Sequence, residues 1–327
     1  MEELNLFNGT DVSSAEKKSN LIHYEGELGC FDYDSEDYEL ITDDNGDYLH
    51  YRGRSTVLNL PKGITNTRKM FQWCTFIEDF TLGDNFDTSN VTDMDYMFGY
   101  CTMPEGFTLS NKFDTSKVTD MHSMFAGCTM PEGFTLGTKF DTSSVTDMDG
   151  MFWDCKLPEG FTLGDKFDTS NVTGMYCMFN KCRLPEGFTL GDKFDTSNVT
   201  DMGCMFNGCK LPDGFTLGDK FDTSSVTDMG CIFNGCKLPD GFTLGNKFDT
   251  SKVTDMRCMF SCCTLPEGLI LDNRFDTSST ADVIDVLTTE FVDFYKATGR
   301  YYDEYLEKAV RYYKSSPAVN LTRDCDL

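Results

Sequence analysis

The sequence predicts an α/β solenoid of 27-residue helix-turn-strand repeats, with a parallel sheet on one face and a cap at each end. Two observations predict it: the phrase FDTS returns at a fixed interval, and apolar residues within each interval follow first a helical and then a strand period. Seven near-identical repeats result, with a degenerate copy at each end. FDTS begins at Phe86, Phe113, Phe140, Phe167, Phe194, Phe221, Phe248 and Phe275.

The first half of each repeat has the pattern of a short amphipathic helix, over 91–101 in one copy. Its apolar residues fall within an arc of about 120° at the helical rotation of about 100° per residue. Thr88 and Ser89 precede this run and could cap the unpaired N–H groups of the first turn. The apolar positions are Val91, Met94, Met97, Phe98 and Cys101.

The second half predicts a turn and a short strand. Pro104 and Gly106 stop a helix, and the next three residues, 107–109, alternate apolar, polar and apolar. One copy cannot bury its own apolar face, so copies must stack, with strands in a parallel sheet and helices covering one side.

The pattern VxxMxxMFxxC followed by a short strand resembles the BspA-like family of leucine-rich repeats. The phrase FDTSNVTDM, with MF three residues on, is similar to a bacterial surface-protein repeat. The resemblance covers about residues 57–290 and implies a leucine-rich-repeat-like solenoid. It also implies protein binding, often at a cell surface, and brings no catalytic residues.

The repeats divide the chain into three parts: 1–56, a polar segment and β-hairpin cap; 57–280, the repeats; and 281–327, a C-terminal helical cap. In the first part, strands over 38–41 and 48–51 should be joined by a turn at Asn45 and Gly46. The nearby Asp43, Asp44 and Asp47 lack the spacing and terminal glutamate of a calcium loop, so we expect a turn there.

Most of the 15 cysteines fall into two columns at the repeat interval. One column should lie at the core edge of the helices and act as small apolar residues. The second, at the position of Tyr96, should face outward.

Helices pack about 8–10 Å apart, too far for disulfides, so free thiols and a reducing compartment are expected. Histidines are absent nearby, so no zinc site is expected. The core column is Cys74, Cys101, Cys128, Cys155, Cys182, Cys209, Cys236 and Cys263, and the outward column is Cys177, Cys204, Cys231 and Cys258.

The charge is strongly acidic, with 28 basic against 54 acidic residues and a formal net charge of -26. Such a surface repels nucleic acid and anionic lipid and favours a basic protein partner, although solubility alone is an alternative explanation. No apolar run is long enough to span a membrane, and the N-terminus has no secretory h-region. We therefore expect a cytoplasmic monomer, or a cell-surface protein if a leader was removed.

Catalytic chemistry has little basis in the sequence. Only His23, His50 and His122 are present, and none lies in a known nucleophile motif. A repeat gives each carboxylate many equivalent copies, whereas an active site requires one unusual environment. The sequence predicts no enzyme activity, no catalytic residue, no metal and no cofactor.

Three features are candidate partner-binding positions. Strand-centre threonines should form a row on the sheet face opposite the helices, though threonine is also an ordinary strand residue. An acidic row runs beside them, and Trp153 should lie on the outer helix face, either as an interface anchor or by sequence drift. The rows are Thr108, Thr135, Thr162, Thr189, Thr216 and Thr243, and Glu105, Glu132, Glu159, Glu186, Asp213, Asp240 and Glu267.

A further pair of columns should be structural. Asp87 and its equivalents every 27 residues, to Asp249, should hold a turn by accepting backbone N–H groups. Lysines two residues earlier, such as Lys112, should offset their mutual repulsion.

The favoured function is a non-enzymatic protein-interaction scaffold that uses the acidic surface, bacterial or carried by a mobile element. One alternative is an acidic mimic of nucleic acid that inhibits a basic nuclease, as in phage counter-defence. Another is a bacterial adhesin. The sequence does not name the partner.

Overall fold

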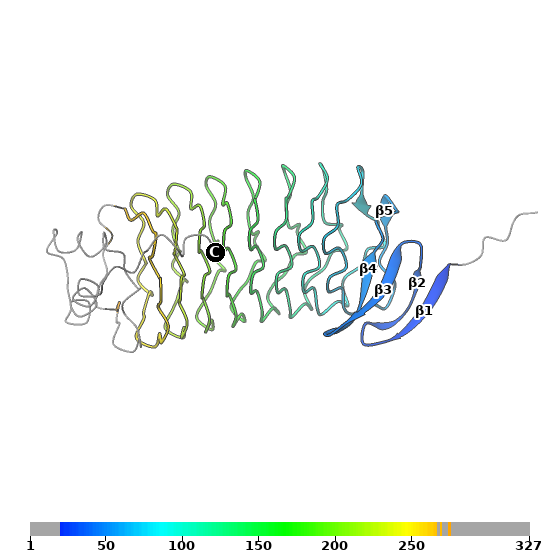
Figure 1. Ribbon diagram of the computed structural model, residues 1–327, viewed down its shortest axis with the longest axis horizontal. Helices are drawn as coiled ribbons and strands as arrows, with labels where there is room; N and C mark the ends of the chain where they lie inside the picture. Colours follow the sequence, from blue (N-terminus) through cyan, green and yellow to red (C-terminus); the bar gives the residue numbers. More distant parts are fainter. Residues whose placement is uncertain (1–19, 267–268, 270–273, 276–327) are drawn as a thin grey trace, which may run out of the picture.

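The computed structural model describes residues 20–266, 269 and 274–275. These residues form two β-hairpins followed by a stack of repeats, each of which makes one circuit of chain that we call a coil (Figure 1). The described residues contain strands and turns but no helix. The parts at 1–19 and 276–327, which include the predicted C-terminal helical cap, lie outside them.

The N-terminal cap consists of two antiparallel hairpins. Strand β1 (Leu21–Gly26) pairs with β2 (Gly29–Asp34), and β3 (Tyr38–Asp43) pairs with β4 (Gly46–Tyr51). The second hairpin confirms the predicted strands and turn, and Gly46 supplies a φ of 102° at that turn. The first hairpin was not predicted.

The predicted helix over 91–101 is wrong, because this segment is a series of tight turns. Alternate N–H groups bond three residues back, as in a β-turn, rather than four back as in an α-helix. These local bonds run from Met97 to Met94, from Gly99 to Tyr96 and from Cys101 to Phe98. The intervening N–H groups donate to the next coil: Met94 to Asp120, Tyr96 to His122, Phe98 to Met124 and Tyr100 to Ala126.

Left-handed residues make this alternation possible. Tyr96 has a φ of 51° and Tyr100 a φ of 59°, each at the third position of a turn. The same two positions are left-handed in the following coils, where they include Gly150 and Gly127. An apolar residue about every third position therefore faces inward in a series of turns, as it would in a helix.

Adjacent coils are joined in parallel and in register. Bridges link Asp93 to Asp120 and Thr102 to Thr129, and both ladders continue at the repeat interval. The predicted strand at 107–109 forms only in the first copy, where β5 (Val57–Leu58) pairs with β6 (Thr81–Leu82). Within the described residues, no continuous parallel sheet covers one face.

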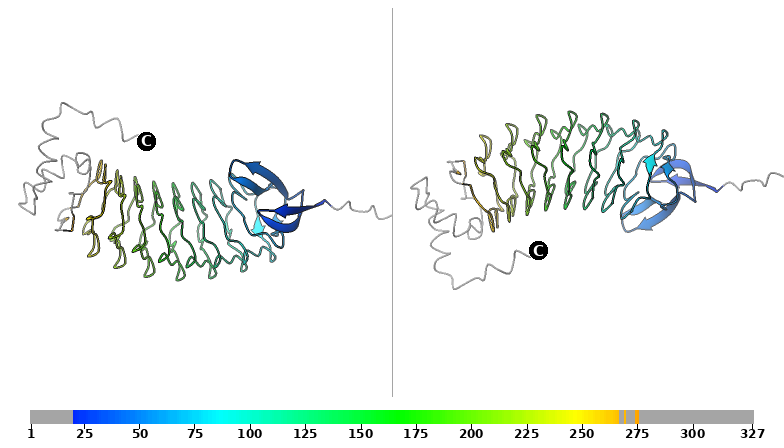
Figure 2. Two further views of the ribbon diagram at one scale, coloured as in Figure 1. Left: turned by 90° about the horizontal axis from the view of Figure 1, so that it is seen from below. Right: turned by 90° about the horizontal axis from the view of Figure 1, so that it is seen from above.

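Stacked phenylalanines fill the interior and set the curvature. Phe98 and Phe125 lie 5.5 Å apart between ring centroids, whereas Phe107 and Phe134 lie 6.3 Å apart. Coils are therefore closer on the hydrogen-bonded side than at the loops that contain 107–109. These loops fan apart along the edge near β5, and the stack bends along its length (Figures 1 and 2).

The threonine predicted to cap a helix instead connects coils. Thr88 is fully buried; its Oγ1 donates to the Asp114 carbonyl at 2.8 Å and accepts the Asp114 N–H at 2.7 Å. The Asp114 carboxylate accepts the N–H of Ser116, and Lys139 lies 3.8 Å from it. The predicted structural roles of the aspartate and lysine columns are confirmed at this site.

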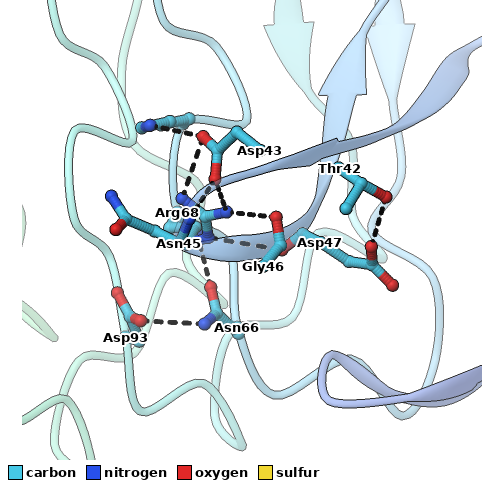
Figure 3. A network of polar contacts seen from close by, with 9 residues as sticks. Thr42, Asp43, Asn45, Gly46, Asp47, Asn66, Arg68 and Asp93 are labelled. Atoms are coloured by element: carbon cyan, nitrogen blue, oxygen red, sulfur yellow. Dashed lines mark hydrogen bonds and ion pairs between the residues drawn. The ribbon is translucent and has the colours of Figure 1, made fainter.

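A buried arginine connects the cap to the first coil (Figure 3). Arg68 is 5% exposed; its Nη2 lies 2.7 Å from Asp43 Oδ1 and donates to the Gly46 carbonyl at 2.6 Å. Lys69 Nζ contacts the other Asp43 oxygen at 2.7 Å. Hydrogen bonds from Arg68 and Lys69 lower the pKa of Asp43, so this carboxylate is an ion-pair partner of the repeats.

We expect Arg68→Met to destabilise the protein by about 3 kcal/mol, because it leaves the Gly46 and Asp47 carbonyls without their arginine donor and removes the buried partner of the Asp43 carboxylate, which keeps Lys69. Arg257→Met is the matched control, since Arg257 pairs with Asp255 but its side chain is 67% exposed. The control should change the free energy of unfolding much less, because exposed ion pairs are weakened by solvent. Urea denaturation measures both, and equal losses would contradict the role of Arg68.

Candidate binding surface

The threonine row is exposed, although not on a sheet. Thr108 is exposed between the buried Phe107 and Leu109, which confirms the alternation of side chains there. The other five threonines have the same burial pattern. Because no ladder joins these loops beyond β6, the row lies on separate loops instead of the predicted parallel sheet.

Two shallow hollows separate neighbouring loops of this row. One, of about 480 Å³, lies between the loops of Thr162 and Thr189, and the next, of about 530 Å³, between those of Thr189 and Thr216. Asp192 lines both, and lysines line each. The structure thus brings successive threonines together around hollows that have equivalent linings, part polar and part apolar.

The acidic row is exposed as predicted, but its charge is unevenly balanced. Glu105, Glu132, Glu159, Glu186, Asp213 and Asp240 are all exposed, and Glu267 lies outside the described residues. From the coil of Glu159 onward an exposed basic column lies three residues before the row. Those residues are Lys156, Arg183, Lys210 and Lys237, whereas Thr102 and Thr129 occupy the position in earlier coils.

Trp153 belongs to a cluster that was not predicted. It is half-buried, and its ring lies edge-on to Tyr100 with centroids 6.0 Å apart. Tyr100 in turn stacks on Trp73 at 3.9 Å and 3°, and Trp73 is 68% exposed. We call Trp73, Tyr100 and Trp153 the aromatic patch. The signal for it was present, since Trp73 and Tyr100 are one repeat interval apart.

A missing side chain makes room for the patch. A Cβ added to Gly127, which follows Tyr100 by one repeat, would lie 2.4 Å from the Tyr100 ring. Burial raises the pKa of Tyr100, and the charges of Tyr96 and Asp154 raise it further. The negative charge of Asp154 therefore acts on the Tyr100 hydroxyl of the patch.

Aspartates along one bridge ladder carry unfavourable charge. Asp120 lies between Asp93 and Asp147 in this ladder. Burial and the charges of these neighbours raise the pKa of Asp120 to about 6, although its bond from the His122 N–H opposes the shift. Burial, followed by the charge of Asp147, likewise raises the pKa of Asp149 to about 6. A hydrogen bond to Asp95 raises the pKa of His122.

The core cysteine column is buried as predicted, except for half-buried Cys74. Cys128 Sγ, for example, donates to the Phe98 carbonyl at 2.8 Å. Burial raises the pKa of these thiols, which makes them poor nucleophiles. The outward column is half-exposed. Its cysteines were predicted to be too far apart for disulfides because packed helices lie about 8–10 Å apart. That spacing does not apply, since no helices are present in this part of the chain.

The described part of the chain contains no group of three or more histidine, cysteine or acidic side chains suited to hold a metal ion. Within the same residues, no helix has the length and apolarity needed to cross a bilayer.

The sequence matches one family, described as "Mycoplasma protein of unknown function, DUF285". Four overlapping matches cover 61–156, 106–210, 129–237 and 186–289, which together exceed half of the chain. No curated protein and no solved structure matches the sequence.

The raised pKa values predict a stability that falls between pH 5 and pH 7.5. A carboxyl group with a folded-state pKa near 6 and an ordinary value of 3.8 binds its proton more tightly in the folded protein. The stabilisation of the folded state by this proton is complete below about pH 4 and is lost as the pH rises through about 6. We expect a higher Tm at pH 5 than at pH 7.5.

Asp120→Asn should reduce this pH dependence, because the amide oxygen can still accept the His122 N–H but carries no charge. Asp222→Asn is the control: burial acts to raise the Asp222 pKa, but hydrogen bonds from Ser224 and the charge of Lys247 lower it overall. Calorimetry of the three proteins at both pH values measures the effect. An unchanged slope in Asp120→Asn would contradict the assignment.

Proposed function

Since the chain belongs to the DUF285 family of Mycoplasma proteins of unknown function, we propose that it is a non-enzymatic solenoid scaffold that binds a basic protein through the aromatic patch. The observation that carries this proposal is the exposure of Trp73. A tryptophan that is 68% exposed and stacked on a tyrosine places a rigid apolar surface in water.

The chemistry of the patch favours a protein partner. Tryptophan and tyrosine supply large contact areas with little loss of side-chain entropy and dominate the energetics of many interfaces. The stacking of Tyr100 holds Trp73 in one orientation before any partner arrives, which reduces the entropic cost of binding. Ile77, which is 37% exposed, adds apolar surface in the first coil.

The charge around the patch favours a basic partner. Glu78 and Asp79 are exposed in the coil of Trp73, and Glu105 is exposed in the coil of Tyr100. The basic column begins only at Lys156, so no basic residue of that column offsets the acidic side chains in the coils that carry Trp73 and Tyr100. This excess of negative charge speeds association with a positively charged surface. The threonine loops would then be a second contact region for a long partner.

The similarity of the repeats to BspA-like surface proteins also supports a binding role. An adhesin and a nucleic-acid mimic would both act by binding, and the identity of the partner distinguishes them. A receptor at a cell surface would indicate the adhesin, and a nucleic-acid enzyme would indicate the mimic.

Affinity purification from extracts of the source organism tests the proposal. We expect Trp73→Ala to lower recovery of the main partner at least about tenfold, as for loss of an interface anchor. Tyr176→Ala is the matched control, because Tyr176 is an exposed aromatic residue, 46% accessible, outside the patch. It should leave recovery unchanged.

Higher salt should weaken recovery of the same partner, since surface charges are screened within about 10 Å at 0.1 M salt. Thermal unfolding of both variants checks that the fold is intact. Full recovery by Trp73→Ala, or a partner with an acidic surface, would overturn the proposal.

A further inference from the structure

The outward cysteine column occupies strained backbone. Cys177, Cys204 and Cys231 have φ values of 57°, 56° and 57°, and Cys258 continues the column at 54°. A residue other than glycine in this conformation costs about 1–2 kcal/mol. Glycine occupies the same position in an earlier coil, at Gly150. Four consecutive coils nevertheless carry a cysteine there.

The spacing of the coils fits a disulfide. The Cys177 N–H donates to the Gly203 carbonyl at 2.8 Å, and that of Cys204 to the Gly230 carbonyl at 2.7 Å. Two core rings of these coils, Phe179 and Phe206, are nearly parallel at 7° with centroids 5.7 Å apart. On this hydrogen-bonded side, adjacent coils are thus about 5–6 Å apart, within the Cα separation typical of disulfides.

The thiols also contact one another. Hydrogen bonds from Cys177 and Cys231 lower the pKa of Cys204, whereas the bonds to Cys204 raise the pKa values of its two neighbours. Asn180 Nδ2 donates to Cys177 Sγ at 3.1 Å. These contacts favour the thiolate form at Cys204 over Cys177 and Cys231.

Small neighbours leave the column accessible. Glycines precede the two central cysteines, at Gly203 and Gly230, and the left-handed position four residues after each is also glycine, at Gly208 and Gly235. The column is half-exposed, and neither Cys177, Cys204 nor Cys231 is in a disulfide. The column therefore lies at the surface of the stack, whereas the core column is buried.

We propose that neighbouring thiols of this column form a reversible dithiol–disulfide site that is oxidised by small disulfides of the glutathione type. The Cys204 thiolate attacks one sulfur of the small disulfide, which forms a mixed disulfide and releases one small thiolate. A neighbouring thiol, Cys177 or Cys231, loses its proton and attacks Cys204 Sγ, which releases the second small thiol. Two protein thiols are oxidised and one small disulfide is reduced to two thiols.

Oxidation would join adjacent coils covalently. The pairs Cys177–Cys204 and Cys231–Cys258 use all four sulfur atoms, whereas Cys204–Cys231 uses the central two. Either arrangement restricts the separation of coils in the C-terminal half of the described stack.

The test is to incubate the folded protein with oxidised glutathione, alkylate the remaining thiols and map the cysteines by mass spectrometry. We expect disulfides between adjacent members of the outward column. The core column is an internal control with the same repeat interval. Its members Cys155, Cys182, Cys209 and Cys236 are at most 2% exposed and should be alkylated only after unfolding. Equal oxidation of both columns, or no disulfide in the outward column, would overturn the proposal.

The variant Cys204→Gly provides a second measurement, since the backbone at Gly150 already accommodates glycine at this position. It leaves Cys177 two coils from Cys231, too far for a disulfide. We expect Cys177 to retain its thiol or a glutathione adduct, while Cys231 and Cys258 still form a disulfide. A Cys177–Cys231 disulfide in this variant would contradict the in-register geometry. Both proteins should carry Cys30→Ser, which removes an exposed thiol from β2.

Discussion

The hydrogen bonds between adjacent coils are the interaction on which the rest of the structure depends. Along 96–100, every second N–H donates to the next coil, and those between close a local turn. This alternation requires a left-handed residue about every four positions, at Tyr96 and Tyr100 in one coil. The backbone is thereby satisfied without helix or extended sheet, which explains why the described coils need neither.

The interior and the surface follow from this register. Because the coils repeat almost by translation, each phenylalanine stacks on its copy, as Phe152 does on Phe179 at 5.6 Å and 6°. The same register repeats surface residues at short intervals. It stacks Trp73 on Tyr100, places Asp120 between two other aspartates, and brings the outward thiols into contact. The candidate sites are therefore consequences of the stacking.

The sequence predicted the repeat interval, the β3–β4 hairpin, the buried core cysteines and the exposure of Thr108 between two buried neighbours. These features depend on the spacing and polarity of residues, which can be read from the sequence itself. It did not predict the turns, because inward residues at Val91, Met94 and Met97 suit a helix and a series of turns equally. Glycines at Gly150 and Gly127 were the available signal. The aromatic patch was missed because it joins residues from three different coils.

The most direct test of the left-handed turns is the effect of Gly150→Ala on the free energy of unfolding. Gly150 has a φ of 61°, and an added Cβ would lie 2.7 Å from Ser123 Oγ, so the account predicts a loss of about 1–2 kcal/mol. Gly230→Ala is the control, since Gly230 is not left-handed and its nearest contact would be 3.3 Å; it should change stability little. In a helix, both substitutions would stabilise by about 1 kcal/mol, and that result would contradict the account.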